Sequence, residues 1–495
     1  MIKYYSSTEY LHGGIMTFSE ALHILPEYQA KNVRLIRLYP VFVTLFFLIA
    51  TPIAVVYTKE WDFFDNLARI LTSPCELITD YFALGGLGST LFNAAVCGII
   101  ANLMIYVCRA EPNATVLAGY MLVVAHCFYG LNFLNMWPPF FGVLIFCKVM
   151  KKRVSEHVHV TFFSTALAPF VSEVLFRYSI GSFDASRAEV SAVGIILSLV
   201  CGMAAGFIVP ALLPGTTAMH RGYNLYKAGL AIGILGIFIH AFMYKTLGVT
   251  NPGQITIVNP EYYAMPYAYR GFMNVFFALF FAFTLLWGFL ANGKSFRGYR
   301  PLIKSTGYGV DFTDKFGMPI CMVNIAIYGL AILAYLNLVF ILPEIFPSLP
   351  AGVGFTGPTV GIVFAALTFA ADGQHPRNVF PIVLGYIALF LTVVGICLIC
   401  GFDIPWTLST QAYINSLAFA TGLCPIAGRY GVRYGILAGA LCAVICTVTA
   451  EMHGGFVLYN GGFTAGLTAL VLIPILDYYK VKSIQDEDTL HNRAE

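Results

Sequence analysis

Charged side chains are scarce in this sequence. Only 11% of its 495 residues are Asp, Glu, Lys or Arg, whereas 58% are hydrophobic, and the mean hydropathy is +0.77. A soluble domain carries about 25% charged residues, so the composition excludes an ordinary soluble protein. The few basic residues flank apolar runs and form no basic face, which argues against a nucleic-acid partner.

Signatures of the common enzyme and pump classes are also missing. There is no G-x-x-x-x-G-K-[ST], no H-E-x-x-H and no G-x-S-x-G. The usual residues of ATP-driven pumping, zinc proteolysis and serine hydrolysis are therefore absent, and we expect no enzymatic activity. No dense acidic cluster suggests a metal site, and we expect no other cofactor. The twelve cysteines lie almost entirely in apolar segments without paired spacing, which argues against a disulfide framework.

The sequence has, instead, a succession of long apolar runs. A helix needs roughly 20 apolar residues to cross a bilayer core about 30 Å thick. About ten to thirteen such runs can be placed between residues 35 and 478. They lack the alternation of a β-barrel, and backbone groups in lipid must be satisfied internally. The sequence therefore predicts an all-α polytopic membrane protein with about 10–13 transmembrane helices, some of them broken or re-entrant.

Lysine and arginine cluster in four stretches, at residues 31–37, 151–153, 294–304 and 480–482. Because cytoplasmic loops are enriched in these residues, we expect all four stretches on the cytoplasmic side of a bacterial inner membrane, with both termini inside. The loop from 251 to 269 has few bases and is expected outside.

An internal duplication is visible in the sequence. Residues 219–233 return in altered form as 452–466, with seven identical positions, among them His220/His453 and Tyr226/Tyr459. Further matches, in the same order along the chain, pair Thr165 and Pro169 with Thr421 and Pro425, Gly85–Thr90 with Gly354–Thr359, and, more weakly, Pro112–Asn113 with Pro376–Asn378.

These matches divide the chain into segments. Repeat 1 is predicted to span 34–250 and repeat 2 to span 316–480, with an extra span and a basic connector at 251–315 between them. Residues 1–33 form a polar or interfacial segment in which Met16 is a candidate translation start, and 481–495 form a cytoplasmic tail. Both copies then start on the cytoplasmic side, which favours a parallel repeat, although transporters frequently use inverted ones.

Glycine-rich interruptions at matching places are the first candidate site. Gly85, Gly88 and Thr90, like Gly354, Gly357 and Thr359, precede or open an apolar helix. Free N–H groups and the positive end of the helix dipole suit an anion or a carbonyl oxygen there. The alternative is that these glycines only allow close helix packing.

Proline breaks are the second candidate site. Thr165 and Thr421 stand four residues before Pro169 and Pro425, where proline frees a backbone carbonyl. Their hydroxyl groups would satisfy that carbonyl or a ligand; the alternative is a simple kink.

Two charged residues occupy equivalent positions past these prolines. Glu173 and Arg429 carry opposite charges, so the sequence suggests an intramembrane ion pair, or else two interfacial side chains.

The matched histidines are the third candidate. His220 and His453 stand at a glycine-rich break between two spans, with Tyr226, Tyr459 and Asn460 downstream in the same motif. Histidine exchanges a proton near neutral pH, so the pair suits proton coupling or binding of a polar solute; the alternative is a helix cap. His126 and His240 lie alone in apolar helices and are interpreted as satisfied core residues.

The sequence resembles a known family in four segments, GGLGSTLFNAA, FSTALAPFVSE, GPTVGIVFAALTFAADGQHPRN and MHGGFVLYNGGFTAG. These are similar to the bacterial membrane proteins of domain-of-unknown-function family 1576, which carry the region twice. The resemblance implies a two-copy membrane fold and brings no activity. In the first copy, Arg221 and Lys227 replace the glycine and asparagine of the H-G-G-x-x-L-Y-N-x-G signature.

The function must therefore be argued from the site. The leading hypothesis is a secondary transporter or channel for a small polar or anionic solute, with a central path at the repeat interface. The expected partners are this solute, membrane lipids and, as an option, further copies of the chain in a homo-oligomer. The alternative is a lipid-handling protein, a flippase or an enzyme on a lipid-linked substrate, using Glu173, His220 and His453. A scaffold or sensor is the third option.

Overall fold

The computed structural model describes residues 8–11, 14–17, 26–178, 189–249 and 269–484. In these ranges the chain is helical apart from a small antiparallel pair of strands, β1 (Thr8–Leu11) and β2 (Gly14–Thr17). Ten of the described helices are long and apolar enough to cross a membrane. The predicted all-helical polytopic membrane fold is confirmed. The loop expected outside lies, except for Tyr269, beyond the described residues, as does the tail from 485 onward.

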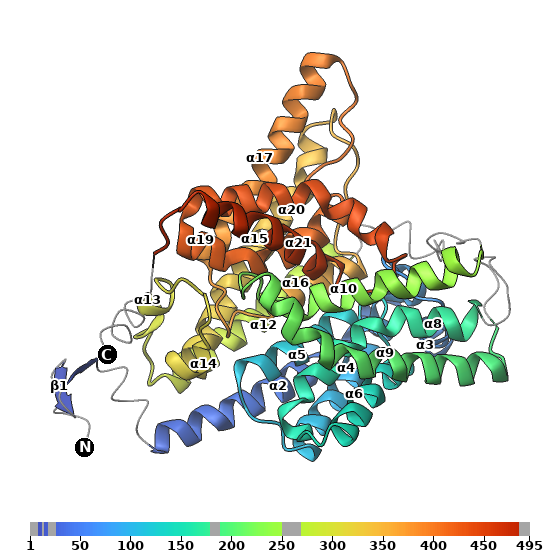
Figure 1. Cartoon of the computed structure of the whole chain (residues 1–495), viewed down its shortest axis with the longest axis horizontal. Helices are drawn as coiled ribbons and strands as arrows, with labels where there is room; N and C mark the ends of the chain where they lie inside the picture. Colours follow the sequence, from blue (N-terminus) through green and yellow to red (C-terminus); the bar gives the residue numbers. More distant parts are fainter. Residues whose placement is uncertain (1–7, 12–13, 18–25, 179–188, 250–268, 485–495) are drawn as a thin grey trace.

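Each half of the chain is a series of long helices and shorter, broken ones (Figure 1). The first half contains α2 (Pro26–Thr58), α3 (Phe63–Thr72), α4 (Tyr81–Val107), α5 (Ala114–His126), α6 (Trp137–Val149), η1 (Val154–Glu156), α7 (Val158–Ser164), η2 (Thr165–Leu167), α8 (Ala168–Phe176), α9 (Ala192–Met219), α10 (Lys227–His240) and the π-helix η4 (Ala241–Thr246). The second half contains α12 (Arg270–Ala291), α13 (Tyr299–Leu302), α14 (Phe312–Lys315), α15 (Met318–Ile345), α16 (Gly357–Leu367), α17 (Pro376–Cys400), α18 (Gln411–Ala420), η5 (Thr421–Leu423), α19 (Cys424–Tyr430), α20 (Val432–Met452) and α21 (Asn460–Tyr478).

The two halves pack by the same plan. Helix α6 lies along α9 as α17 lies along α20, α5 packs on α7 as α16 packs on α18, and α8 packs on α9 as α19 packs on α20. Helix α12 packs on α15 as α2 packs on α4. The span at α12, interpreted from sequence as an extra helix, therefore holds the place in the second half that α2 holds in the first.

Polar caps repeat with the helices. The Asn113 side chain accepts a hydrogen bond from Val116 N at the start of α5, and the Thr356 side chain accepts one from Thr359 N at the start of α16. Within α4 and α15, Asn93 donates to Cys127 O and Leu131 O, and Asn324 donates to Ala370 O and Gln374 O. Because buried polar groups require partners, these matched bonds fix the same connection in each half.

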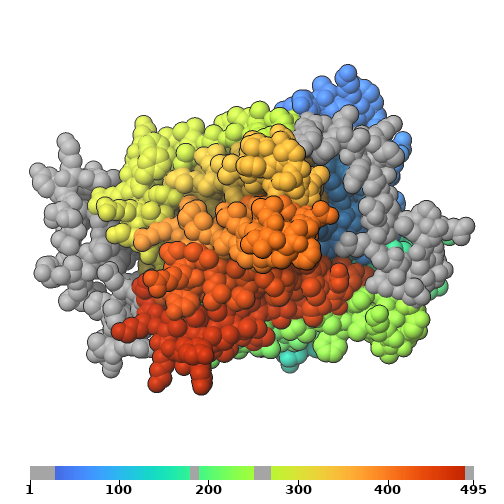
Figure 2. Space-filling model, turned by 90° about the horizontal axis from the view of Figure 1, so that it is seen from above, coloured from blue at the N-terminus to red at the C-terminus, as the bar shows by residue number. Residues whose placement is uncertain are grey.

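Phenylalanine side chains of both halves fill the core between α2, α12 and α16. The Phe364 ring lies 5.2 Å from Phe47, 5.7 Å from Phe280 and 6.2 Å from Phe128, measured between ring centroids. In Figure 2 the yellow to red segments of the second half pack into one continuous surface, with blue and green segments of the first half at its edges.

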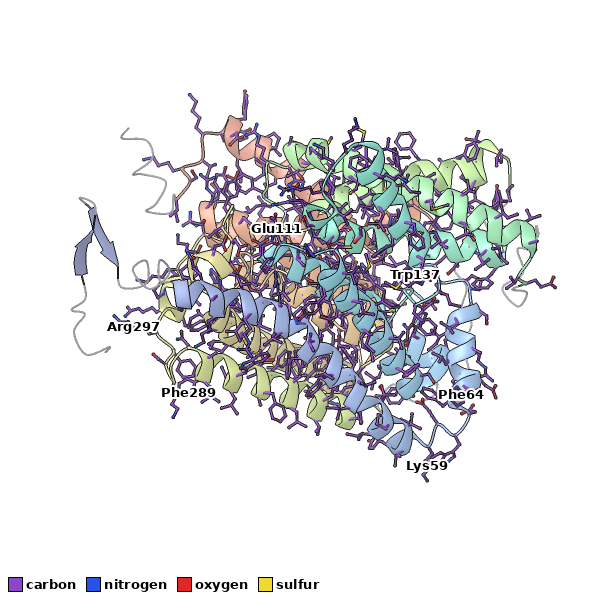
Figure 3. The ribbon with its side chains drawn as sticks, turned by 90° about the horizontal axis from the view of Figure 1, so that it is seen from below. Lys59, Phe64, Glu111, Trp137, Phe289 and Arg297 are labelled. Carbon is purple, nitrogen blue, oxygen red and sulfur yellow. The ribbon has the colours of Figure 1, made fainter. Side chains whose placement is uncertain are left out.

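Helices α2 and α12 run antiparallel. Lys31 Nζ at the start of α2 donates to Ala291 O at the end of α12, whereas the Tyr57 ring at the end of α2 lies 5.4 Å from Phe272 near the start of α12. Figure 3 shows Lys59 and Phe289 at opposite ends of this pair. Since α2 and α12 are equivalent, the two repeats are inverted, and the parallel arrangement that the sequence favoured is wrong.

Short helices explain this error. Helices α5 and α6 form a hairpin whose ends are joined, because Glu111 N donates to Ser155 O; Val353 N and Ser409 O join the ends of the α16–α17 hairpin in the same way. A hairpin returns the chain to its own side. The remaining crossings in each half are α2, α4, α7–α8, α9 and α10 or their equivalents, an odd number that inverts the second copy.

The start of α2 and the last described residues lie on one face. Tyr28 OH donates to Phe316 O, Ile484 N donates to Arg429 O, and the Arg429 guanidinium lies 4.6 Å from the Tyr308 ring centroid. We call this side the terminal face and the other the far face.

The two-fold axis that relates the repeats passes through the crossing of α10 and α21. A Cβ on Gly229 would lie 2.4 Å from Gly462 C, and these two glycines are equivalent. Gly233 meets Phe463 on one side of the crossing, and Gly466 meets Leu230 on the other. Contact between equivalent residues places the repeated motif on the axis.

A methyl group at this crossing is expected to destabilise the protein. Gly229→Ala inserts a Cβ against Gly462 backbone, and overpacking of this kind costs about 1–3 kcal/mol. Gly395 of α17 is the matched control, because a Cβ there meets nothing within 4 Å. Thermal unfolding in detergent should show a lower Tm for Gly229→Ala than for the wild type and an unchanged Tm for Gly395→Ala. Equal Tm values for the two variants would contradict close packing at the axis.

Candidate functional site

The repeated motif of each half docks on the broken helix of the other half. Leu225 N donates to Gly422 O in η5, and Leu458 N donates to Ala166 O in η2, each at 3.0 Å. The proline breaks thus expose a carbonyl that accepts an extended segment of the opposite repeat. The Thr165 and Thr421 hydroxyl groups donate instead to Phe162 O and Ala418 O, three residues back.

Two equivalent tyrosines meet on the axis. The Tyr226 and Tyr459 ring centroids are 6.1 Å apart. Tyr226 OH donates to Ala365 O at 2.6 Å, whereas Tyr459 OH has no hydrogen-bond partner among the described residues. Their neighbours differ as well, because Tyr226 contacts Phe369 at 4.7 Å and Tyr459 contacts His126 at 5.5 Å.

His126, Tyr129 and Tyr459 form a central polar cluster. The His126 ring lies 5.6 Å from Tyr129, and the three side chains are at most 1% exposed. Both His126 nitrogens, Tyr129 OH and Tyr459 OH lack a hydrogen-bond partner in the described part of the chain. An unpaired buried polar group costs about 1–3 kcal/mol, so such a concentration calls for a functional reason. The interpretation of His126 as a satisfied core residue is wrong.

A cavity of about 180 Å³ on the far-face side is lined by one member of this cluster, Tyr129. Helix α20 begins next to Arg429 on the terminal face and ends at Met452, so Glu451 marks the far-face end of the cavity. Besides Tyr129, its polar lining is formed by Asn415, Ser416, Thr447, Glu451 and Asn460.

Two of the predicted residues hold the cavity wall in place. His453 Nε2 and Asn460 Oδ1 are 3.0 Å apart. On the other side, Gln411 Nε2 donates to Thr359 Oγ1 and to Asn415 Oδ1, at 3.2 and 2.8 Å. Thr359, His453, Tyr459 and Asn460 are thus brought to one place. Gln411, Asn415, His126 and Tyr129 were missed, because no repeat or motif distinguishes them in the sequence.

The other histidine of the motif lies across the axis. His220 is buried, and neither of its ring nitrogens has a partner in the described ranges. Burial lowers the pKa of His220 and that of His453 to about 4. Both rings are therefore neutral near pH 7, which weakens the idea that this pair carries the coupling proton.

The first glycine break already holds an anion of the protein itself. Gly86 has φ +78° and interrupts α4, which leaves N–H groups free. Gly88 N donates to both Glu60 carboxylate oxygens at 3.0 and 2.9 Å, and Ser89 N donates to Oε2 at 3.3 Å. Gly85 packs against Ile70, and Thr90 Oγ1 donates to Gly86 O.

The second glycine segment is closed in a similar way. Gly357 N donates to Asp80 Oδ1 at 2.8 Å, and Thr356 caps the same helix start; Gly354 is buried just before it. The two glycine segments are not equivalent, since Gly85–Thr90 lies within α4 and Gly354–Thr359 opens α16, the counterpart of α5. The pairing of Pro112–Asn113 with Pro376–Asn378 fails for the same reason, because the caps Asn113 and Thr356 correspond.

Removing the Glu60 carboxylate is expected to reopen the break in α4. Glu60→Ala leaves buried N–H groups unpaired, at a cost of about 1–3 kcal/mol. Acetate or formate in the buffer should restore part of the lost Tm, because a free carboxylate fits the same N–H groups. Glu344→Ala is the control, since this half-exposed side chain pairs loosely with Arg270 at 3.6 Å. An unchanged Tm for Glu60→Ala would refute the assignment.

Glu173 and Arg429 do not pair. Arg177 Nε lies 2.8 Å from Glu173 Oε2, whereas Arg429 lies over Tyr308 and contacts Ser483 Oγ at 3.4 Å. The inverted symmetry is the physical reason. Equivalent positions far from the axis lie on opposite faces, so these two side chains are held apart.

These features define an integral membrane protein of two inverted repeats whose broken helices meet at the centre. The chain belongs to the family described as "Protein of unknown function (DUF1576)", which matches residues 59–245 and again 291–478. Each match begins where the equivalent helix α2 or α12 ends. The resemblance seen in the sequence is confirmed. No curated protein and no solved structure matches the chain.

Proposed function

We propose that the protein is a secondary transporter for a small polar or anionic solute, with its path at the interface of the two repeats. The observation that carries the proposal is the cavity lined by Tyr129, a member of the central polar cluster, and by Asn460 of the repeated motif. Binding sites of transporters with inverted repeats lie at the repeat interface near the bilayer midplane, next to discontinuous helices.

The residues on the terminal-face side that are equivalent to the cavity lining bear on alternating access. Lys227 is equivalent to Asn460, and Asp372 is equivalent to Tyr129 through the matched bonds of Asn93 and Asn324. Lys227 is exposed and Asp372 half-buried. We infer that these charged positions mark a second approach to the axis, which rocking of the repeats would open in turn with the first.

The side chains that line the cavity indicate which class of solute it could bind. Amide and hydroxyl groups of Asn415, Ser416 and Asn460 offer donors and acceptors, and Glu451 disfavours an anion on the far-face side. Lys227 favours an anion on the terminal-face side. A neutral polar solute, or one that carries a single carboxylate beside hydroxyl groups, fits both approaches.

The positive-inside rule gives the orientation that we propose. Lys31 lies on the terminal face through its hydrogen bond to Ala291 O, and Figure 3 shows Arg297 at the same end; these bases would make that face cytoplasmic in a bacterial inner membrane, with both termini inside. Self-association stays a prediction. The lipid-handling alternative would need Glu173, His220 and His453 open to the bilayer, and all three side chains are buried.

Uptake into proteoliposomes tests the proposal. Purified protein would be assayed with a panel of neutral and anionic polar solutes, beside the variant Asn460→Lys, which gives the second repeat the lysine of the first. A buried cation in the cavity should lower uptake by about tenfold or more, whereas Thr392→Ala on exposed α17 should have no effect. If folded wild-type protein takes up none of the solutes in the panel, the proposed transport function is contradicted.

A further inference from the structure

A buried charge cluster lies near the far face, apart from the central polar cluster. Glu76 comes from the segment between α3 and α4, Glu173 and Arg177 from the end of α8, and Tyr244 from η4. Arg177 Nε lies 2.8 Å from Glu173 Oε2, Arg177 Nη2 contacts Glu76 Oε1, and Tyr244 OH donates to Glu173 Oε1. The charged side chains are at most 3% exposed.

The charges of this cluster do not balance. Two carboxylates face one guanidinium, which leaves one negative charge in a buried site. Buried charges are strongly disfavoured unless paired. Other titratable or charged groups described on the packed elements are Cys75, Tyr178, Glu189, His240, Lys245, Glu451 and His453. Of these, Glu189, Lys245 and Glu451 are exposed, and none of the seven forms a salt bridge with the cluster within the described ranges.

A bound proton accounts for the neutralisation of this excess negative charge better than a bound metal ion does. The Arg177 guanidinium lies between the two carboxyl groups and would repel a second cation. No group of three metal-ligating side chains occurs in the described part of the chain. Glu173 accepts hydrogen bonds from Arg177 and Tyr244, whereas Glu76 Oε2 has no hydrogen-bond partner there. A proton on Glu76 would also let one carboxyl group donate to the other.

We propose that Glu76, held against Glu173 and Arg177, is the proton-binding site that couples the protein to a proton gradient. Binding of the proton stands on the geometry of the cluster, and the coupling rests on the proposed transport function. Protonation neutralises the cluster, and release of the proton leaves it with a single negative charge beside the cavity wall.

Glu76 is joined to the path by its neighbours. Leu77 N donates to Gly455 O at 2.9 Å, inside the repeated motif of the second half. Leu77 and Ile78 line the cavity, and a Cβ on Gly455 would lie 3.0 Å from Glu76 Cβ. A change of charge on Glu76 therefore acts on backbone that contacts both the cavity and the motif at the axis.

Infrared difference spectroscopy of the purified protein tests the proton site without any solute. The carbonyl stretch of a protonated carboxyl group should be present in the wild type near neutral pH and should shift in D₂O. It should be lost in Glu76→Gln, and also in Glu173→Gln, because either variant leaves one carboxylate with one guanidinium and needs no proton. Glu156→Gln, which alters a surface pair with Arg153, should keep the band. A band that persists in both cluster variants would overturn the proposal.

Because two cluster variants are compared, the infrared test stays decisive if one of them fails to fold.

The coupling is then tested in proteoliposomes with a solute that the wild type transports. An imposed pH gradient should drive accumulation by the wild type, whereas Glu76→Gln should exchange the solute and lose pH-driven accumulation. Accumulation by Glu76→Gln would overturn the coupling. If the wild type transports nothing, the proposed function fails, and the infrared band still decides the proton site.

Discussion

Replacing His126 with Phe is expected to abolish solute uptake and to leave the protein at least as stable as the wild type. Both His126 nitrogens are buried without partners, and such groups cost about 1–3 kcal/mol of folding free energy each. The equivalent position already holds Phe369 against Tyr226, so a phenyl ring fits beside Tyr459. We expect uptake below about a tenth of wild type, with an equal or higher Tm.

The reverse exchange is the matched control. Phe369→His places an imidazole beside Tyr226, whose hydroxyl group is already bound to Ala365 O, and it should lower the Tm without creating a second site. Flux and thermal unfolding would be measured on the same preparations. A strong loss of stability in His126→Phe, with uptake per folded molecule unchanged, would show that His126 is structural and would remove the central polar cluster from the path.

The variant Arg177→Gln is expected to show the largest loss of stability of all the substitutions considered. It leaves the Glu76 and Glu173 carboxyl groups buried without their common partner, and breaking a buried ion pair from one side costs about 3–5 kcal/mol. The loss should shrink as the pH falls, because protonation removes the uncompensated negative charges.

Arg153→Gln is the control, because it removes an ion pair that is exposed to solvent, whereas the ion pairs of Arg177 are buried. Arg153 also pairs with a glutamate, Glu156, but its side chain is 74% exposed, and we expect no measurable change. Unfolding of both variants would be followed over a range of pH. A pH-independent loss for Arg177→Gln would point to lost packing and against an excess of buried carboxyl charge.

Local sequence features predicted the repeated motif and the proline breaks correctly. Thr165–Leu167 and Thr421–Leu423 are equivalent 3-10 turns, and Tyr226 and Tyr459 meet at the axis. Both features are recognised from residues that lie close together in the sequence. Proline removes a backbone hydrogen bond wherever it falls inside a helix, and seven matches within fifteen residues reflect duplication.

Features that depend on distant contacts were predicted poorly. The glycine pair Gly85–Thr90 and Gly354–Thr359 rested on a short pattern that apolar helices produce often, and the structure assigns the two segments to different helices. Glu60 lies outside any motif, yet its carboxylate occupies the N–H groups that the glycines expose. The partner of Glu173 is one turn away at Arg177, and the matched position Arg429 lies on the other face.

That this protein is a two-copy helical membrane protein can be read from the sequence, because apolar runs and repeated residues are visible along the chain. The inversion, the polar cluster of His126, Tyr129 and Tyr459, and the buried Glu76–Arg177–Glu173 arrangement became visible in the folded protein. The orientation of the second copy depends on how many segments cross the membrane, and short helices such as α5 and α6 leave that number open in the sequence. Whether a buried polar group has a partner is set by helices that meet across a two-fold axis, and no local pattern records that meeting.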